Sequence, residues 1–152
     1  EKTVFITEGP LKGDLAHALS GRTFGCVPGA NQYANLPPFL EAMQLMGTKN
    51  VYEAYDMDKL LKTICRGDYN EKCVHCENYK KDWRGQAIPC EKKCVKRQNI
   101  QRGCRKLAEI CRELELSAKA LTWDTDEDGD WAEHVKGVDD YLYGLKQKNN
   151  NS

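Results

Sequence analysis

The sequence predicts an all-α fold, a disulfide-stapled bundle of about five helices that follows an irregular N-terminal arm. Seven of the eight cysteines lie between residues 65 and 111, a stretch rich in charge and poor in large aliphatic side chains. Such a stretch buries little apolar surface, so covalent or metal cross-links must help to hold it. Apolar residues recur at helical spacing over most of the chain, and no alternating strand pattern follows residue 10.

Length and charge narrow the class of protein. The chain has 152 residues, which fits a single domain, taken as residues 1–146 with a disordered tail over 147–152. Its 23 basic and 23 acidic residues balance, so we expect no nucleic-acid partner. No apolar run is long enough to span a bilayer. The chain starts with Glu1 rather than Met, which either removal of a signal peptide or trimming of the chain would explain.

Residues 1–36 form the predicted irregular arm. The apolar run Thr3–Ile6 is either a short strand or an anchored N-terminal segment. Glycine and proline then recur too often for a long element, although residues 11–19 can form a short helix with the leucines on one face. Cys26 is expected to fasten this arm to the helical body.

The helices are predicted from apolar spacing and from residues that start or stop a helix. Pro37 and Pro38 suit a first turn, and the helix that follows them stops at Gly47. Either Asp56 or Asp58 is a suitable N-cap for a second helix. The other helices are expected over residues 71–83, from residue 89 to about residue 123 with a kink at Gly103, and over residues 131–146.

The cysteines allow two interpretations. In an oxidising compartment their even number predicts four disulfides, with the connectivity left open because eight cysteines allow 105 pairings. In a reducing compartment the Cys-x2-Cys and Cys-x3-Cys pairs have the spacing of a zinc site with four thiolate ligands. The even count and the missing initiator Met favour disulfides. The predicted disulfide residues are Cys26, Cys65, Cys73, Cys76, Cys90, Cys94, Cys104 and Cys111, and the zinc alternative uses Cys73, Cys76, Cys90 and Cys94.

The tripeptide Arg66-Gly67-Asp68 lies between two cysteines and is a sequence that integrins bind. A tight turn at Gly67 would project the two charged side chains apart and leave the carboxylate free to complete a metal site on the partner. The structural alternative is that Gly67 ends one helix and that Asp68 or Asn70 caps the next.

An acidic loop between the last two predicted helices has the first half of an EF-hand calcium motif. Alternate carboxylates converge on a hard cation there, and Gly129 permits the sharp turn. The twelfth loop position holds Val135 instead of a bidentate Glu, so we expect a weak calcium site rather than a complete EF-hand. Its predicted ligands are Asp124, Asp126, Asp128 and Glu133, and no other cofactor is expected. The alternative is an acidic loop that caps the following helix.

A short pattern, Cys65-x3-Tyr69-x3-Cys73, resembles the Cys-Tyr-Cys motifs of the bicycle family, the secreted salivary effectors of gall-forming aphids. The resemblance covers residues 65–73 and implies a secreted protein that acts on a host target.

Taken together, these features predict a secreted, non-catalytic interaction protein, an effector whose partner is a host protein or receptor. None of the three histidines lies in a nucleophile or metal motif, which is why we expect no enzyme. The alternatives are an intracellular zinc-binding adaptor and an integrin ligand of the Arg-Gly-Asp type.

Overall fold

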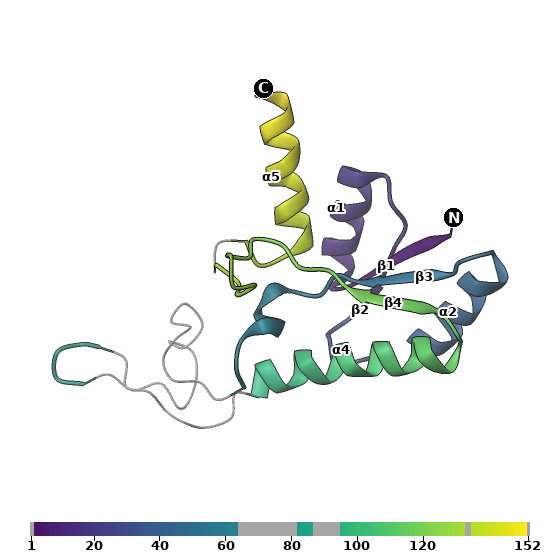
Figure 1. Cartoon of the computed structure of the whole chain (residues 1–152), viewed down its shortest axis with the longest axis horizontal. Helices are drawn as coiled ribbons and strands as arrows, with labels where there is room; N and C mark the ends of the chain where they lie inside the picture. The colour runs from purple at the N-terminus through teal and green to yellow at the C-terminus, as the bar shows by residue number, and fades with distance from the viewer. Residues whose placement is uncertain (1, 64–81, 87–94, 133–134, 152) are drawn as a thin grey trace.

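The computed structural model describes residues 2–63, 82–86, 95–132 and 135–151. These residues form a mixed α/β fold with a four-stranded parallel sheet, so the all-α prediction is wrong (Figure 1). The strands are β1 (Thr3–Glu8), β2 (Phe24–Val27), β3 (Asn50–Glu53) and β4 (Ser117–Ala120), in the order β2-β1-β3-β4. The helices are α1 (Pro10–Ser20), α2 (Leu36–Leu45), the 3-10 helix η1 (Met57–Leu60), α4 (Val95–Glu113) and α5 (Val138–Asn150).

The N-terminal segment is the centre of the sheet and not an irregular arm. Residues 1–36 contain β1, α1 and β2, and β1 pairs in parallel with both β2 and β3. Phe5 lies beside Phe24 on one neighbouring strand and Tyr52 on the other, with ring centroids 5.1 and 5.2 Å apart. Aromatic residues in such cross-strand rows stabilise pairing, which explains how strands of four to six residues persist here.

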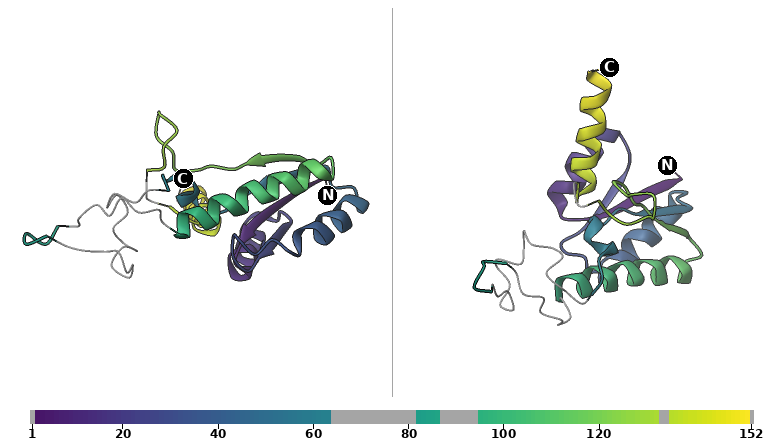
Figure 2. Two further views of the ribbon diagram at one scale, coloured as in Figure 1. Left: turned by 90° about the horizontal axis from the view of Figure 1, so that it is seen from below. Right: turned by 60° about the vertical axis from the view of Figure 1, so that its left-hand side comes forward.

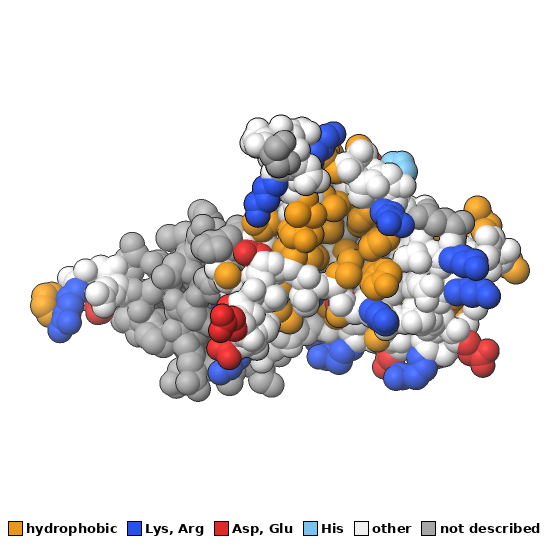
Figure 3. Space-filling view, turned by 45° about the horizontal axis from the view of Figure 1, so that its top comes forward, with side chains coloured by type: hydrophobic (Ala, Val, Ile, Leu, Met, Phe, Trp, Pro, Cys, Tyr) orange, Lys and Arg blue, Asp and Glu red, His pale blue; other side chains and the backbone are white. Residues whose placement is uncertain are grey.

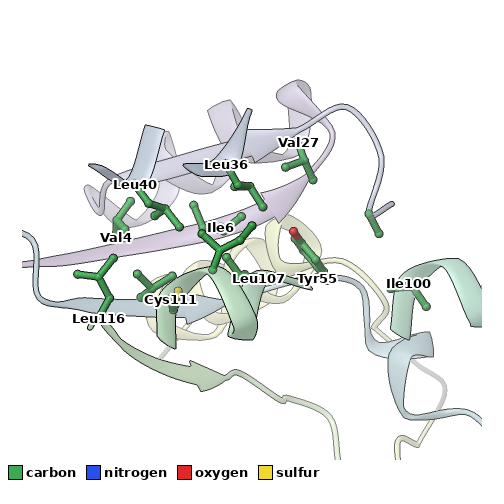
Figure 4. Close-up of a cluster of buried hydrophobic side chains, with 13 residues drawn as sticks. Val4, Ile6, Val27, Leu36, Leu40, Tyr55, Ile100, Leu107, Cys111 and Leu116 are labelled. Atoms are coloured by element: carbon green, nitrogen blue, oxygen red, sulfur yellow. The ribbon is translucent and has the colours of Figure 1, made fainter. Parts of the chain in front are cut away.

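Helices cover both faces of the sheet, as parallel sheets require. Figure 2 shows α4 running along one side of the sheet and α5 projecting away from the other. The main core lies between the strands and the α2–α4 layer, where Leu40, Leu107 and Cys111 meet Val4 and Ile6 (Figure 4).

A second apolar cluster joins α1 and α5 on the opposite face. Its buried members are Ala16, Ala54, Met57, Trp123, Trp131 and Val138. Here the structure also departs from the predicted helix face, because Leu11 and Leu15 of α1 are 72% and 45% exposed while Gly13 and Ala16 are buried. Apolar side chains gather on the surface that carries α1 and α5 (Figure 3).

Two predicted helices end early because the chain turns into other elements. The helix expected after Asp56 is the single turn η1. The long helix expected to reach residue 123 ends at Glu113, where Glu115 adopts a left-handed φ of 59° and the chain turns into β4. α5 starts at Val138 and continues to Asn150, which includes part of the segment predicted as a tail.

Candidate functional site

The strand order places a crevice at the carboxyl edge of the sheet, between β1 and β3. The chain leaves β1 toward β2 on one side and reaches β4 on the other side of β3. Ligands of open α/β sheets bind where the strand order reverses in this way. Glu8 is the last residue of β1, and Asp56 and Asp58 follow β3, so three carboxylates reach this edge.

Two lysines neutralise the acids in this crevice. Lys12 Nζ, from the first turn of α1, lies 2.9 and 2.8 Å from the two carboxylate oxygens of Asp56. Lys136 Nζ, from the segment before α5, lies 3.2 Å from Asp58 and 3.8 Å from Asp56. Asp56 is only 4% exposed, and a buried carboxylate requires such compensation. Asp58 Oδ1 is buried and has no hydrogen-bond partner among the described residues.

Glu8 is the titratable group that this crevice perturbs most clearly. Burial raises the pKa of Glu8 to about 7, helped by the charge of Asp56 and by a hydrogen bond with it, while Lys12 opposes the shift. The charge of Asp58 raises this pKa as well. A carboxyl group with a pKa near neutrality can both accept and donate a proton at physiological pH, which is the property of a general acid or base.

A cavity of about 390 Å³ opens over these side chains. Its other walls come from the segment after β2, which supplies Asn31, and from the first turns of α4, which supply Lys96 and Asn99. Gly9, with φ of 84°, makes the tight turn between β1 and α1 at its base. The cavity therefore combines three carboxylates, three ammonium groups and two side-chain amides.

The described residues include no ready-made group of three Asp, Glu, His or Cys side chains around a common metal position. In the crevice, Lys12 and Lys136 contact the acids instead. A divalent cation would therefore have to exchange with an ammonium group. The oxygen donors of Asp56 and Asp58 are the kind that hard cations prefer.

The four-disulfide framework is contradicted. Cys26, Cys104 and Cys111, the cysteines within the described ranges, are free thiols. Cys26 lies on β2 against Gly13 of α1, and the other two lie on α4. Burial raises the pKa of Cys111 to about 11, and burial together with Glu53 raises that of Cys104, so both are poor thiolates at neutral pH. Among the described residues, an α/β core and not a disulfide holds the fold together.

Other predicted sites lie outside the described residues. They are the Arg66-Gly67-Asp68 tripeptide, the remaining cysteines with the zinc alternative, and Glu133. Their roles stay predictions.

The acidic loop is built from its own carboxylates. Asp126 Oδ1 accepts hydrogen bonds from the backbone N–H groups of Asp128 and Asp130 at 2.9 and 3.0 Å. Asp124 Oδ2 accepts one from the Val135 N–H at 2.8 Å. These bonds organise the turn, and calcium binding by the loop stays a prediction.

Sequence reasoning missed the crevice residues. The sequence predicts a helix cap at either Asp56 or Asp58 and assigns no role to Glu8. The available signal was an apolar run ending in Glu8-Gly9-Pro10 and a second run ending in Asp56-Met57-Asp58. Acidic residues directly after two buried strands meet only if those strands are neighbours in a parallel sheet.

Comparison with family models, curated proteins and solved structures finds no match for the chain. The resemblance to the bicycle family, the predicted secretion and the predicted host partner therefore stay predictions. Within the parts of the chain that are described, no helix is long and apolar enough to cross a membrane.

Proposed function

We propose that the crevice between β1 and β3 binds a divalent cation of the Mg²⁺ type together with a phosphate ester, and that it carries out phosphoryl transfer. The observation that supports this proposal is the convergence of Glu8, Asp56 and Asp58 with lysines in one cavity at the switch point of the sheet.

The charges suit such a ligand pair. Mg²⁺ is commonly held by one or two carboxylates plus phosphate oxygens of the substrate. Entry of the cation would release Lys12 and Lys136 from Asp56 and Asp58, and both ammonium groups could then bind phosphate oxygens. The unpartnered Oδ1 of Asp58 is available as a further oxygen donor.

Glu8 supplies the proton-transfer group. Without a cation in the crevice the pKa of Glu8 is about 7. A bound cation would lower this pKa, so Glu8 would be ionised and able to take a proton from an attacking hydroxyl or water. The cation, when bound, would stabilise charge that develops on the phosphate oxygens. The role as a non-catalytic interaction protein that the sequence predicts is the competing hypothesis.

Binding of Mn²⁺, a paramagnetic substitute for Mg²⁺, tests the cation part by electron paramagnetic resonance. We expect one site that Asp56→Asn weakens by about tenfold or more, equivalent to about 1.4 kcal/mol. Asp126→Asn in the acidic loop is the matched control and should leave this site unchanged. If Asp126→Asn abolishes binding and Asp56→Asn does not, the cation belongs to the acidic loop and the proposal is wrong.

Hydrolysis of bis(p-nitrophenyl) phosphate with Mg²⁺ tests the reaction. Glu8→Gln should lower the rate by about a hundredfold, the low end for loss of a general base, with Mn²⁺ binding largely retained. Equal rates for the wild type and Glu8→Gln would refute the catalytic role.

A further inference from the structure

Among the described residues, no strand pairs with the outer edge of β4. β4 is an end strand of the sheet, and its four residues are all exposed. The N–H groups of Ser117 and Leu121 donate to Lys49 O at 3.0 Å and Glu53 O at 2.8 Å on the β3 side. Because the backbone groups of a strand alternate in direction, those of Ala118 and Ala120 point to the open edge. An edge of this kind is a template for a further strand.

Two cavities follow each other along this edge, between β4 and α4. The first, of about 240 Å³, is lined by Ala118, Ala120 and apolar residues such as Leu107. The second, of about 300 Å³, is lined by Ala120, Thr122 and Gln101. The small side chains of β4 leave this space unfilled. Side chains two positions apart on an added strand point to the same face and are about 7 Å apart, so successive ones can enter successive cavities.

The charge around the cavities is basic. Arg105 is exposed and lines both cavities, and Lys119 is exposed on β4. The acidic residue among the lining side chains is Glu53, which is buried and paired with Lys59. A symmetric antiparallel pairing of β4 with a second copy, centred on residue 119, would place Lys119 opposite its own equivalent, which is unfavourable. Charge complementarity therefore favours an acidic strand from another protein.

We propose that the β4 edge binds an extended segment of a partner protein as a fifth strand, with apolar side chains in the two cavities and acidic side chains beside Arg105 and Lys119. Main-chain hydrogen bonds to Ala118 and Ala120 supply affinity, and the cavities supply specificity, as in other strand-addition complexes.

Fluorescence anisotropy with labelled synthetic peptides tests this interface. The probe is a peptide of four Val-Glu repeats, and the comparison peptide has four Val-Lys repeats. We expect the acidic peptide to bind and the basic peptide to bind about tenfold more weakly or not at all. Arg105→Glu should weaken binding of the acidic peptide by about tenfold. Arg102→Glu, on the same helix and outside both cavities, is the control and should have little effect on this binding.

The backbone contacts are tested from both partners. Ala118→Pro removes an outward N–H but no bond to β3, so it should abolish peptide binding while thermal unfolding remains cooperative. N-methylation of alternate peptide amides should also abolish peptide binding. This test uses the wild-type protein, so its result does not depend on how a variant folds. The proposal would be overturned if the N-methylated peptide still bound, or if Arg105→Glu left binding of the acidic peptide unchanged. Concentration-dependent dimerisation that Ala118→Pro abolishes would assign the edge to a second copy and would also overturn it.

Discussion

Replacing Lys59 by Met tests how much the buried ion pair between Lys59 and Glu53 matters for the stability of the fold. The Lys59 and Glu53 side chains are 5% and 9% exposed and form an ion pair. Lys59 Nζ also donates to Leu121 O at 2.6 Å and lies 5.4 Å from the centre of the Trp123 ring. Lys59→Met keeps a similar apolar volume but leaves the Glu53 carboxylate in the interior without its cation. The Tyr55 N–H, at 2.9 Å, and the Cys104 thiol still form hydrogen bonds with this carboxylate.

The expected loss in the free energy of unfolding is about 3–5 kcal/mol, the usual result of leaving one partner of a buried pair uncompensated. The pair itself contributes much less, because desolvation offsets most of its attraction. The double variant Glu53→Gln/Lys59→Met should therefore recover about 1–3 kcal/mol relative to the sum of the single variants.

Urea denaturation followed by far-ultraviolet circular dichroism measures these values for all four members of the cycle. The exposed pair formed by Lys106 and Glu109, 3.2 Å apart, is the matched control, and Lys106→Met should hardly move the midpoint. A loss below about 1 kcal/mol for Lys59→Met, or strictly additive single variants, would show that Glu53 and Lys59 are not a buried, coupled pair.

Three further predictions concern packing and pH. Gly103→Ala should destabilise the protein by about 1–3 kcal/mol in the same assay, because a Cβ there would overlap the backbone oxygen of Ala30, whereas Gly144→Ala, with open space, should stabilise it by about 0.5–1 kcal/mol. An equal effect of the two substitutions would contradict the close contact between α4 and residue 30. The pKa of Glu8 is about 7 in the folded protein against an ordinary value of 4.5, so the folded state binds more protons between these values and stability should fall as pH rises from 5 to 8. After allowance for solvent screening we expect a loss of about 1–2 kcal/mol, measured by melts at the two pH values, and Glu8→Gln should remove it. A pH-independent wild type would show that Glu8 is not perturbed.

Several helices were predictable because their signals are local. The prolines at 37 and 38 start α2, Leu40 is buried as its spacing requires, and Gly47, with φ of 100°, follows its end. The position of α1 was also predictable, but its buried face was not. The face of α1 that packs inward is the one with small residues, because Gly13 has to approach Cys26 closely.

The sheet escaped prediction because its strands are short and their partners are remote. β3 and β4 have four residues each and pair although more than sixty positions separate Asn50 from Ser117. The β4 sequence, Ser-Ala-Lys-Ala, has no strand preference of its own and depends on its neighbour for its conformation. The dense cysteines, by contrast, are a local signal and predict a stapled bundle.

By itself the sequence determined the composition of the chain, its balanced charge, and where proline, glycine and apolar spacing start and stop several helices. The tertiary structure decided the fold class, the free state of three cysteines and the assembly of the crevice. Lys12 and Asp56 are 44 positions apart and meet only because β1 and β3 are parallel neighbours whose carboxyl ends share one edge. Local residue preferences do not predict which strands become neighbours, because strand pairing depends on burial of both faces of the whole sheet.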